Sequence, residues 1–288
     1  MDLILAFVAA FTVSIQSILK KKYGERARGG AFLFCAVSVL FACLFFVITC
    51  SDWVFDPIML IYSLAFALSY SVAVIFSFLA IACGPLALSN LIVSYSLLLP
   101  AFFGILFMNE TVKTTLFLGI ALLAVALYMT GKKKDAEGAE KKEKSLKWLI
   151  FITLAFLGNG ICSIVQNIYA KNYGDHGKSV FMIIALASLA AFFTVYSLCQ
   201  RSERENIVHN LKGGFVIAAL CGCANGLTNL LVLYLLARLP SSVMFPIISA
   251  GGMIFVFVYS LIVLKEKYTT MQKIGYVLGT ISIILLNL

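Results

Sequence analysis

Long apolar runs, separated by short polar segments, dominate the pattern of this chain. Ten runs approach or exceed the roughly 20 apolar residues that cross a bilayer. They cover residues 3–20, 30–50, 58–82, 86–107, 114–130, 147–170, 179–199, 213–236, 241–264 and 270–288. Long unbroken runs predict helices, because the strands of a membrane barrel alternate between apolar and polar residues. We therefore expect an all-α polytopic membrane protein with ten transmembrane helices.

One long polar segment, residues 131–147, divides these runs into two sets of five. It is rich in Lys, Glu, Gly and Ala, and we interpret it as a charged hydrophilic linker rather than a domain. The predicted units are thus residues 1–130 and 148–288, each a five-helix repeat. Because five is odd, the second repeat must enter the membrane from the opposite side, which predicts two inverted repeats (5+5).

Similar short segments in the two halves support a duplication. Gln16 and Gln166 lie 150 positions apart, and each is followed by Tyr-Gly seven and eight positions later. Further along the chain the offset grows to 155, where Gly84-Pro85 corresponds to Leu239-Pro240.

Each half also ends in a polar turn with one glutamate between two apolar runs. Glu110 and Glu266 lie 156 positions apart, and Gly119 and Gly275 follow them by nine positions each. A carboxylate at such a turn can cap a helix or reach the headgroups. We prefer this structural role, closing a helix hairpin, to that of a ligand for a transported ion.

Composition and charge agree with a lipid environment. Hydrophobic residues make up 62% and charged residues 12% of the chain, against roughly 45–50% and 25% in soluble domains. The net charge of +9 arises between the apolar runs, as orientation signals do, and does not indicate nucleic acid as a partner. Segments 20–29, 131–147, 200–212 and 265–273 hold 18 of the 22 Lys and Arg residues. This count predicts a cytoplasmic location for these segments and both termini outside.

No pattern for covalent or acid–base chemistry is present. The two histidines, His176 and His209, lie in loops, and the chain has no phosphate-binding loop or nucleophile elbow. The eight cysteines lie in or beside apolar runs without Cys-x-x-Cys spacing, which favours buried apolar filler over disulfides or metal ligands. We expect no enzyme, no catalytic residue, no cofactor and no metal.

The apolar runs contain uncharged polar residues but no charged ones away from their ends. A solute would therefore be recognised by amides, hydroxyls and aromatic rings. Gln16 and Gln166 occupy matching places, while Asn225, Thr228 and Asn229 share one helix face. These residues either line a cavity or form hydrogen bonds between helices, worth about 0.6 kcal/mol each. Both interpretations stay open.

Two prolines, Pro100 and Pro246, lie inside apolar runs. An interior proline removes one backbone hydrogen bond and kinks the helix. The kink is either a hinge or a static feature that neighbouring helices tolerate.

Ten spans in two halves, each closing with Asn/Lys-Glu and a glycine nine positions on, resemble the EamA-like family of the drug/metabolite transporter superfamily. The resemblance covers essentially the whole chain. It implies an ATP-independent carrier for small metabolites, with alternating access to a cavity lined by spans 1, 3, 4, 6, 8 and 9. By resemblance, the polar residues of that lining are Gln16, Tyr70, Ser94, Gln166, Asn225 and Ser249. We add Thr228 because it shares a helix face with Asn225. Such families usually keep both termini in the cytoplasm, against the charge count.

We therefore expect a secondary transporter in the cell (plasma) membrane for a small neutral or zwitterionic metabolite, such as an amino acid. Its expected partners are that small-molecule substrate and the lipid bilayer. The alternative is a lipid or amphiphile flippase, or a membrane scaffold, of the same fold. Gly275 and Gly279 form a small-xxx-small stripe that packs either inside the monomer or between two copies, which leaves a homodimer open.

Overall fold

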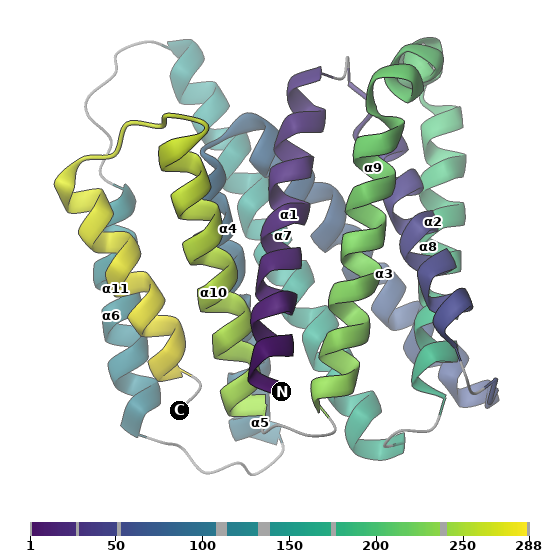
Figure 1. Cartoon of the computed structure of the whole chain (residues 1–288), viewed down its shortest axis with the longest axis horizontal. Helices are drawn as coiled ribbons and strands as arrows, with labels where there is room; N and C mark the ends of the chain where they lie inside the picture. Colours follow the sequence, from purple (N-terminus) through teal and green to yellow (C-terminus); the bar gives the residue numbers. More distant parts are fainter. Residues whose placement is uncertain are drawn as a thin grey trace.

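The computed structural model describes the chain apart from residues 1, 27–28, 51–52, 108–113, 132–138, 174–176, 237–240 and 287–288. The described residues form helices and no strands (Figure 1). The elements are α1 (Asp2–Arg26), α2 (Ala31–Thr49), α3 (Pro57–Cys83), α4 (Leu86–Ser94), the 3-10 turn η1 (Tyr95–Leu97), α5 (Leu98–Phe107), α6 (Thr114–Gly131), α7 (Ala139–Tyr173), α8 (Lys178–Cys199), α9 (Arg201–Leu236), α10 (Ser241–Ile262) and α11 (Thr270–Leu286).

Each of the ten predicted runs corresponds to helical structure. Within the described residues, six helices are long and apolar enough to cross a membrane, namely α1, α2, α3, α7, α8 and α9. Shorter apolar stretches lie in α6, α10 and α11. Large apolar side chains face outward, with Ile48 82% and Leu68 73% exposed. Exposed apolar surface on this scale is what a lipid solvent accommodates, so the multi-pass helical class is confirmed.

The fourth run is broken, whereas the sequence predicted one continuous span over residues 86–107. Pro100 has no N–H for the carbonyl of Ser96, and its ring crowds that carbonyl, so the α-helix gives way to η1. The break itself is held by two other helices, α7 and α11. Asn159 Nδ2 donates to Ser96 Oγ at 2.6 Å, and the Tyr95 hydroxyl donates to the Gly279 carbonyl at 3.2 Å.

The second proline behaves differently. Pro246 lies in α10, which continues as an α-helix from Ser241 to Ile262. Of the two predicted kink positions, Pro100 alone is accompanied by a break in the described helices.

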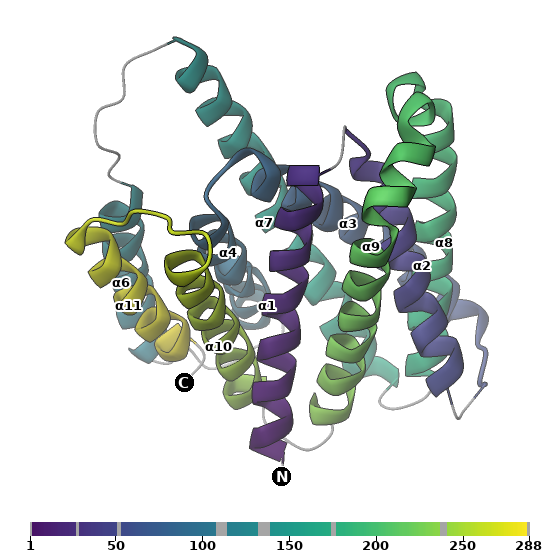
Figure 2. The same ribbon diagram turned by 45° about the horizontal axis from the view of Figure 1, so that its top comes forward.

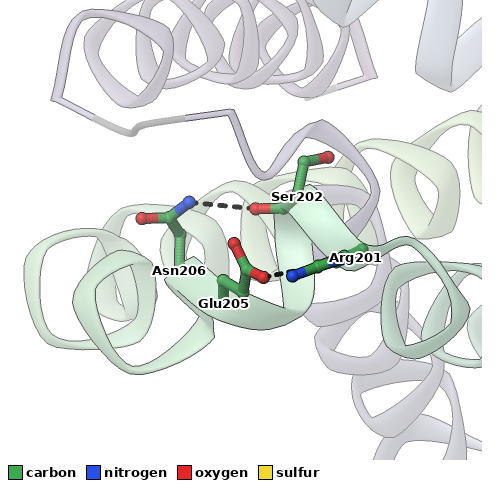
Figure 3. Close-up of polar contacts among 4 residues, drawn as sticks. All are labelled: Arg201, Ser202, Glu205 and Asn206. Atoms are coloured by element: carbon green, nitrogen blue, oxygen red, sulfur yellow. Dashed lines mark hydrogen bonds and ion pairs between the residues drawn. The ribbon is translucent and has the colours of Figure 1, made fainter.

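Two helices begin earlier than the hydropathy pattern predicted. Helix α7 starts at Ala139, so residues 139–147 of the predicted linker are helical. Helix α9 starts at Arg201 rather than near residue 213. Its exposed first turns hold Arg201 Nε against Glu205 Oε1 at 2.8 Å, and Asn206 Nδ2 against the Ser202 carbonyl at 2.9 Å (Figure 3). Such i,i+4 pairs stabilise a charged helical segment that has no apolar signature.

Helices from the two halves of the chain pack on one another. Helix α1 packs on α9 and α10, and α7 packs on α3 and on α4 and α5. Helix α2 contacts α8, and α6 contacts α11. Both chain ends lie at one end of the bundle, while α1, α6, α8 and α10 finish at the other end (Figures 1 and 2). The four basic segments, 20–29, 131–147, 200–212 and 265–273, therefore lie at the ends of helices that finish on one side of the bundle. The charge count requires this common side.

Glycines allow α9 to approach α2 closely. A Cβ on Gly222 would lie 2.2 Å from the carbonyl oxygen of Ser38, and one on Gly226 would lie 2.7 Å from Phe45 Cβ. Neither distance is compatible with a side chain, so these glycines face a neighbouring helix.

Helices α6 and α11 pack closely in the same way. Ser282 Oγ donates to the carbonyl of the buried Gly119 at 2.8 Å, and a Cβ on Gly275 would lie 2.8 Å from Thr130 Cγ2. A Cβ on Gly279 would lie 2.8 Å from the Tyr95 hydroxyl. The Gly275 and Gly279 stripe therefore packs inside the monomer.

Candidate functional site

Four polar side chains form a hydrogen-bonded group where α1, α3 and α9 meet. Asn225 Nδ2 of α9 donates to Gln16 Oε1 of α1 at 2.9 Å and to the Tyr70 hydroxyl of α3 at 2.8 Å. Gln16 Nε2 donates to Thr228 Oγ1 at 2.8 Å. We call Gln16, Tyr70, Asn225 and Thr228 the amide cluster; its bonds join helices from both halves of the chain.

Helical spacing explains how these groups meet. Asn225 and Thr228 are three residues apart on α9, and Asn229 completes their shared face by donating to Asn225 Oδ1 at 3.2 Å. On α1, Thr12 precedes Gln16 by one turn, and its hydroxyl lies 2.7 Å from Thr228 Oγ1. The shared face predicted for α9 is therefore turned toward α1.

The amide cluster is not sealed in the core. Thr228 is buried, with 8% exposure, but Gln16, Tyr70 and Asn225 are half-buried although helices surround them. A polar group that stays partly exposed between helices can exchange its protein partners for water or for a solute. These residues thus bond helices together, and three of them keep part of their surface exposed.

Three other predicted cavity residues lie apart from this group. Gln166 is half-buried on α7, and its Nε2 lies 3.9 Å from Met182 Sδ of α8. Ser94 is half-buried at the end of α4 beside the break, and Ser249 is half-buried on α10. Among the described residues, no hydrogen bond joins any of the three to the amide cluster.

Sequence reasoning missed Lys20 because it was assigned to a loop. Helix α1 continues to Arg26, so Lys20 lies one turn beyond Gln16 on the same helix face. Its Nζ donates to Ser77 Oγ of α3 at 3.2 Å. The four-residue spacing from Gln16 was the signal that pointed to it.

The glutamate turns are described in part. Glu110 lies outside the described residues. Glu266 is half-buried in the loop between α10 and α11, where its carboxylate accepts the Tyr268 hydroxyl and its N–H donates to the Ser260 carbonyl at 3.0 Å. Burial, and then the bond to Glu266, raise the pKa of Tyr268 well above its ordinary value of 10.0. These contacts are those of a side chain that closes a turn.

None of the eight cysteines, all of which lie among the described residues, forms a disulfide, but they are not uniformly buried. Cys83, Cys199 and Cys223 are exposed, whereas the sequence favoured buried filler for all of them. No cluster of three or more His, Cys, Asp or Glu side chains suited to a metal occurs in the described part of the chain.

Comparison with known proteins identifies the fold and nothing narrower. No protein-family model matches the chain. No curated protein matches it either. Chains from solved structures do match, 28 in number. One, described only as "Crystal structure of protein", is 14% identical over 100% of this chain and 98% of its own, with a TM-score of 0.59. The helical bundle seen here is thus similar, over its full length, to an experimentally determined one.

Proposed function

We propose that this protein is a secondary transporter that moves a small neutral or zwitterionic metabolite across the plasma membrane by alternating access. The observation that carries the proposal is the amide cluster, a partly exposed set of uncharged hydrogen-bonding groups inside an apolar bundle. Polar side chains are costly in a membrane interior and usually mark a substrate pathway there. The resemblance to EamA-like carriers points to the same class of activity.

The packing of the helices supports an inverted repeat. Helix α1 packs on α9 as its proposed counterpart α7 packs on α3, while α2 pairs with α8 and α6 with α11. Helices α1 and α7 run in opposite directions along the bundle (Figure 1). Tyr70 and Asn225 are 155 positions apart, the offset that relates Gly84 to Leu239. Matching positions that touch each other are expected at a two-fold axis, which is where transporters of this kind bind substrates.

The broken fourth span supports the proposal independently. Discontinuous helices supply carbonyl and N–H groups to substrate sites in secondary transporters. Here the break at η1 faces α7 through the Asn159–Ser96 bond, so two elements of the proposed repeats meet at it.

Uptake by the purified protein in liposomes tests the proposal, with a mixture of the twenty common amino acids as probe and mass spectrometry as readout. We expect the wild type to accumulate at least one of them. Asn225→Leu, which keeps the number and branching of the side-chain heavy atoms, should reduce that uptake about ten- to a hundredfold because it removes both bonds to the amide cluster.

Ser63→Ala is the matched control. It breaks a buried bond from Ser63 Oγ to the Phe181 carbonyl (3.0 Å) between α3 and α8. This bond lies two turns, about 10 Å, along α3 from Tyr70 on the side opposite Ser77, and its loss should leave uptake unchanged. Wild-type liposomes that accumulate no more than empty ones would refute amino-acid transport. Movement of a fluorescent phospholipid between leaflets in the same liposomes would favour the flippase instead.

A further inference from the structure

Three consecutive lysines near the end of α1 have three different environments. Lys22 is exposed. Lys21 Nζ donates to the carbonyls of Ile81 and Gly84 at 3.3 Å each, at the C-terminal end of α3. A lysine there satisfies unpaired carbonyls and the helix dipole. Lys20 has neither role, because the residue is half-buried and its Nζ donates to α3 further inside the bundle.

The depth of Lys20 can be read from both helices. Its partner Ser77 precedes the last residue of α3, Cys83, by six positions, and Lys20 precedes the end of α1 at Arg26 by six. At 1.5 Å per residue both lie about 9 Å inside the helix ends. Lys20 forms no ion pair within the described part of the chain. An ammonium group held at this depth without an ion-pair partner can take up an anionic ligand.

Lys20 and Ser77 continue the faces that carry the amide cluster. On α1, Lys20 follows Gln16 by four residues, which separates the two levels by about 6 Å along the helix. On α3, Ser77 follows Tyr70 by seven residues, two turns on the same face. The ammonium–hydroxyl level therefore lies about 6 Å from the amide–phenol level along α1 and about 10 Å from it along α3. This suits a small molecule with an oxyanion at one end and a hydrogen-bonding group at the other.

The two halves of the chain differ at this position. At the offset of 150 that relates Lys21 to Lys171, Lys20 corresponds to Ala170. Helix packing shared by both halves therefore does not require a lysine here. A single ammonium matches the single charge of a carboxylate better than the two charges of a phosphate, whose recognition favours arginine or several cations.

We propose that Lys20 and Ser77 form a subsite for the carboxylate of the substrate, which is therefore a zwitterion rather than an uncharged molecule. This inference rests on the proposed transport function and narrows its substrate class. The carboxylate pairs with the Lys20 ammonium, while the amide cluster holds the polar end.

Uptake of matched pools tests the subsite. One pool contains amino acids and the other contains the corresponding amino acid amides, which lack the carboxylate. We expect wild-type liposomes to take up the first pool and exclude the second. Lys20→Met should lower uptake about ten- to a hundredfold, Lys20→Arg should retain part of it, and the matched control Lys22→Met should behave as wild type. Equal uptake of both pools, or full uptake by Lys20→Met, overturns the carboxylate subsite and leaves transport standing.

A second measurement does not depend on transport. The melting temperature of the purified protein in detergent is followed with sodium acetate, sodium phosphate or sodium chloride at equal ionic strength. Acetate should raise it in the wild type and in Lys22→Met, and should do so weakly in Lys20→Met. Stabilisation by phosphate alone would overturn the carboxylate subsite and indicate a phosphate ligand. The absence of any acetate effect would overturn the subsite even if uptake is seen.

Discussion

Glu203 is a buried carboxylate that connects the two halves of the chain, and its removal tests that connection. It is 4% exposed on the first turn of α9. Its two carboxylate oxygens accept the N–H groups of Phe32 and Leu33 at 3.0 Å each. These N–H groups belong to the first turn of α2, where the N-cap residue Gly30 has no side chain to offer. Glu203 therefore supplies, from the second half, the cap that α2 lacks.

We expect Glu203→Ala to lower the free energy of unfolding by about 3–5 kcal/mol. Each buried N–H that loses its partner costs about 1–3 kcal/mol. The lost negative charge at the N-terminus of α2 adds up to about 2 kcal/mol in a partly buried geometry. Glu203→Gln keeps one acceptor oxygen but not the charge, so about half of this loss is expected.

Thermal unfolding in detergent, followed by tryptophan fluorescence, measures the effect. At about 2–3 °C per kcal/mol, Glu203→Ala should melt roughly 6–15 °C below wild type. Glu205→Ala is the matched control, since it removes the same charge two residues on. Its exposed side chain pairs with Arg201 alone among the described residues (Figure 3), and that pair is worth about 0.5 kcal/mol or less. If both variants melt together, the carboxylate does not cap α2 and the reasoning fails.

Four further outcomes are expected. Gly222→Ala should lower the melting temperature because its Cβ would lie 2.2 Å from a backbone oxygen of α2, whereas Gly213→Ala, with open space around it, should not. Pro100→Ala should abolish uptake while the protein stays folded if the break is a hinge, and unchanged uptake would identify a static kink. Tyr268→Phe should be less stable than wild type below about pH 10 and lose that difference at higher pH, because the raised pKa of Tyr268 holds its proton in the folded state and its ionisation cancels the bond to Glu266. A reporter at the C-terminus that fluoresces only in the cytoplasm should stay dark if the charge count sets the orientation.

The helical spans followed directly from the sequence because apolar length is a strong signal. Every predicted run is helical over most of its described residues, and the face shared by Asn225 and Thr228 turned out to point at α1 as a unit. Both features depend on local spacing, which a sequence records in full. The first residues of α7 and α9 could not be predicted from the sequence, because helical turns in water carry no apolar pattern. Such turns depend on pairs such as Arg201 with Glu205.

Partners across the bundle were not predictable from one chain. Gln16 and Gln166 looked equivalent, yet Gln16 joins the amide cluster and Gln166 faces Met182 of α8. Symmetry of sequence fixes which helix carries each amide but not which side chain meets it. Lys20 was assigned to a loop for a related reason, since a lysine at the end of an apolar run looks like an orientation signal whichever way it points.

The two levels of the proposed site differ in how they can accept a ligand. Asn225 Nδ2 already donates two hydrogen bonds, to Gln16 and to Tyr70. A substrate acceptor must therefore displace one of these two acceptors. An ammonium has three donors, and Lys20 donates to Ser77 alone among the described residues, so it can accept a carboxylate without breaking a bond between helices. The bond that Asn225 donates to Tyr70 crosses between the halves of the chain. A ligand that binds first at Lys20 and then exchanges this bond would therefore link its own binding to the separation of α3 from α9, which is the coupling that alternating access needs.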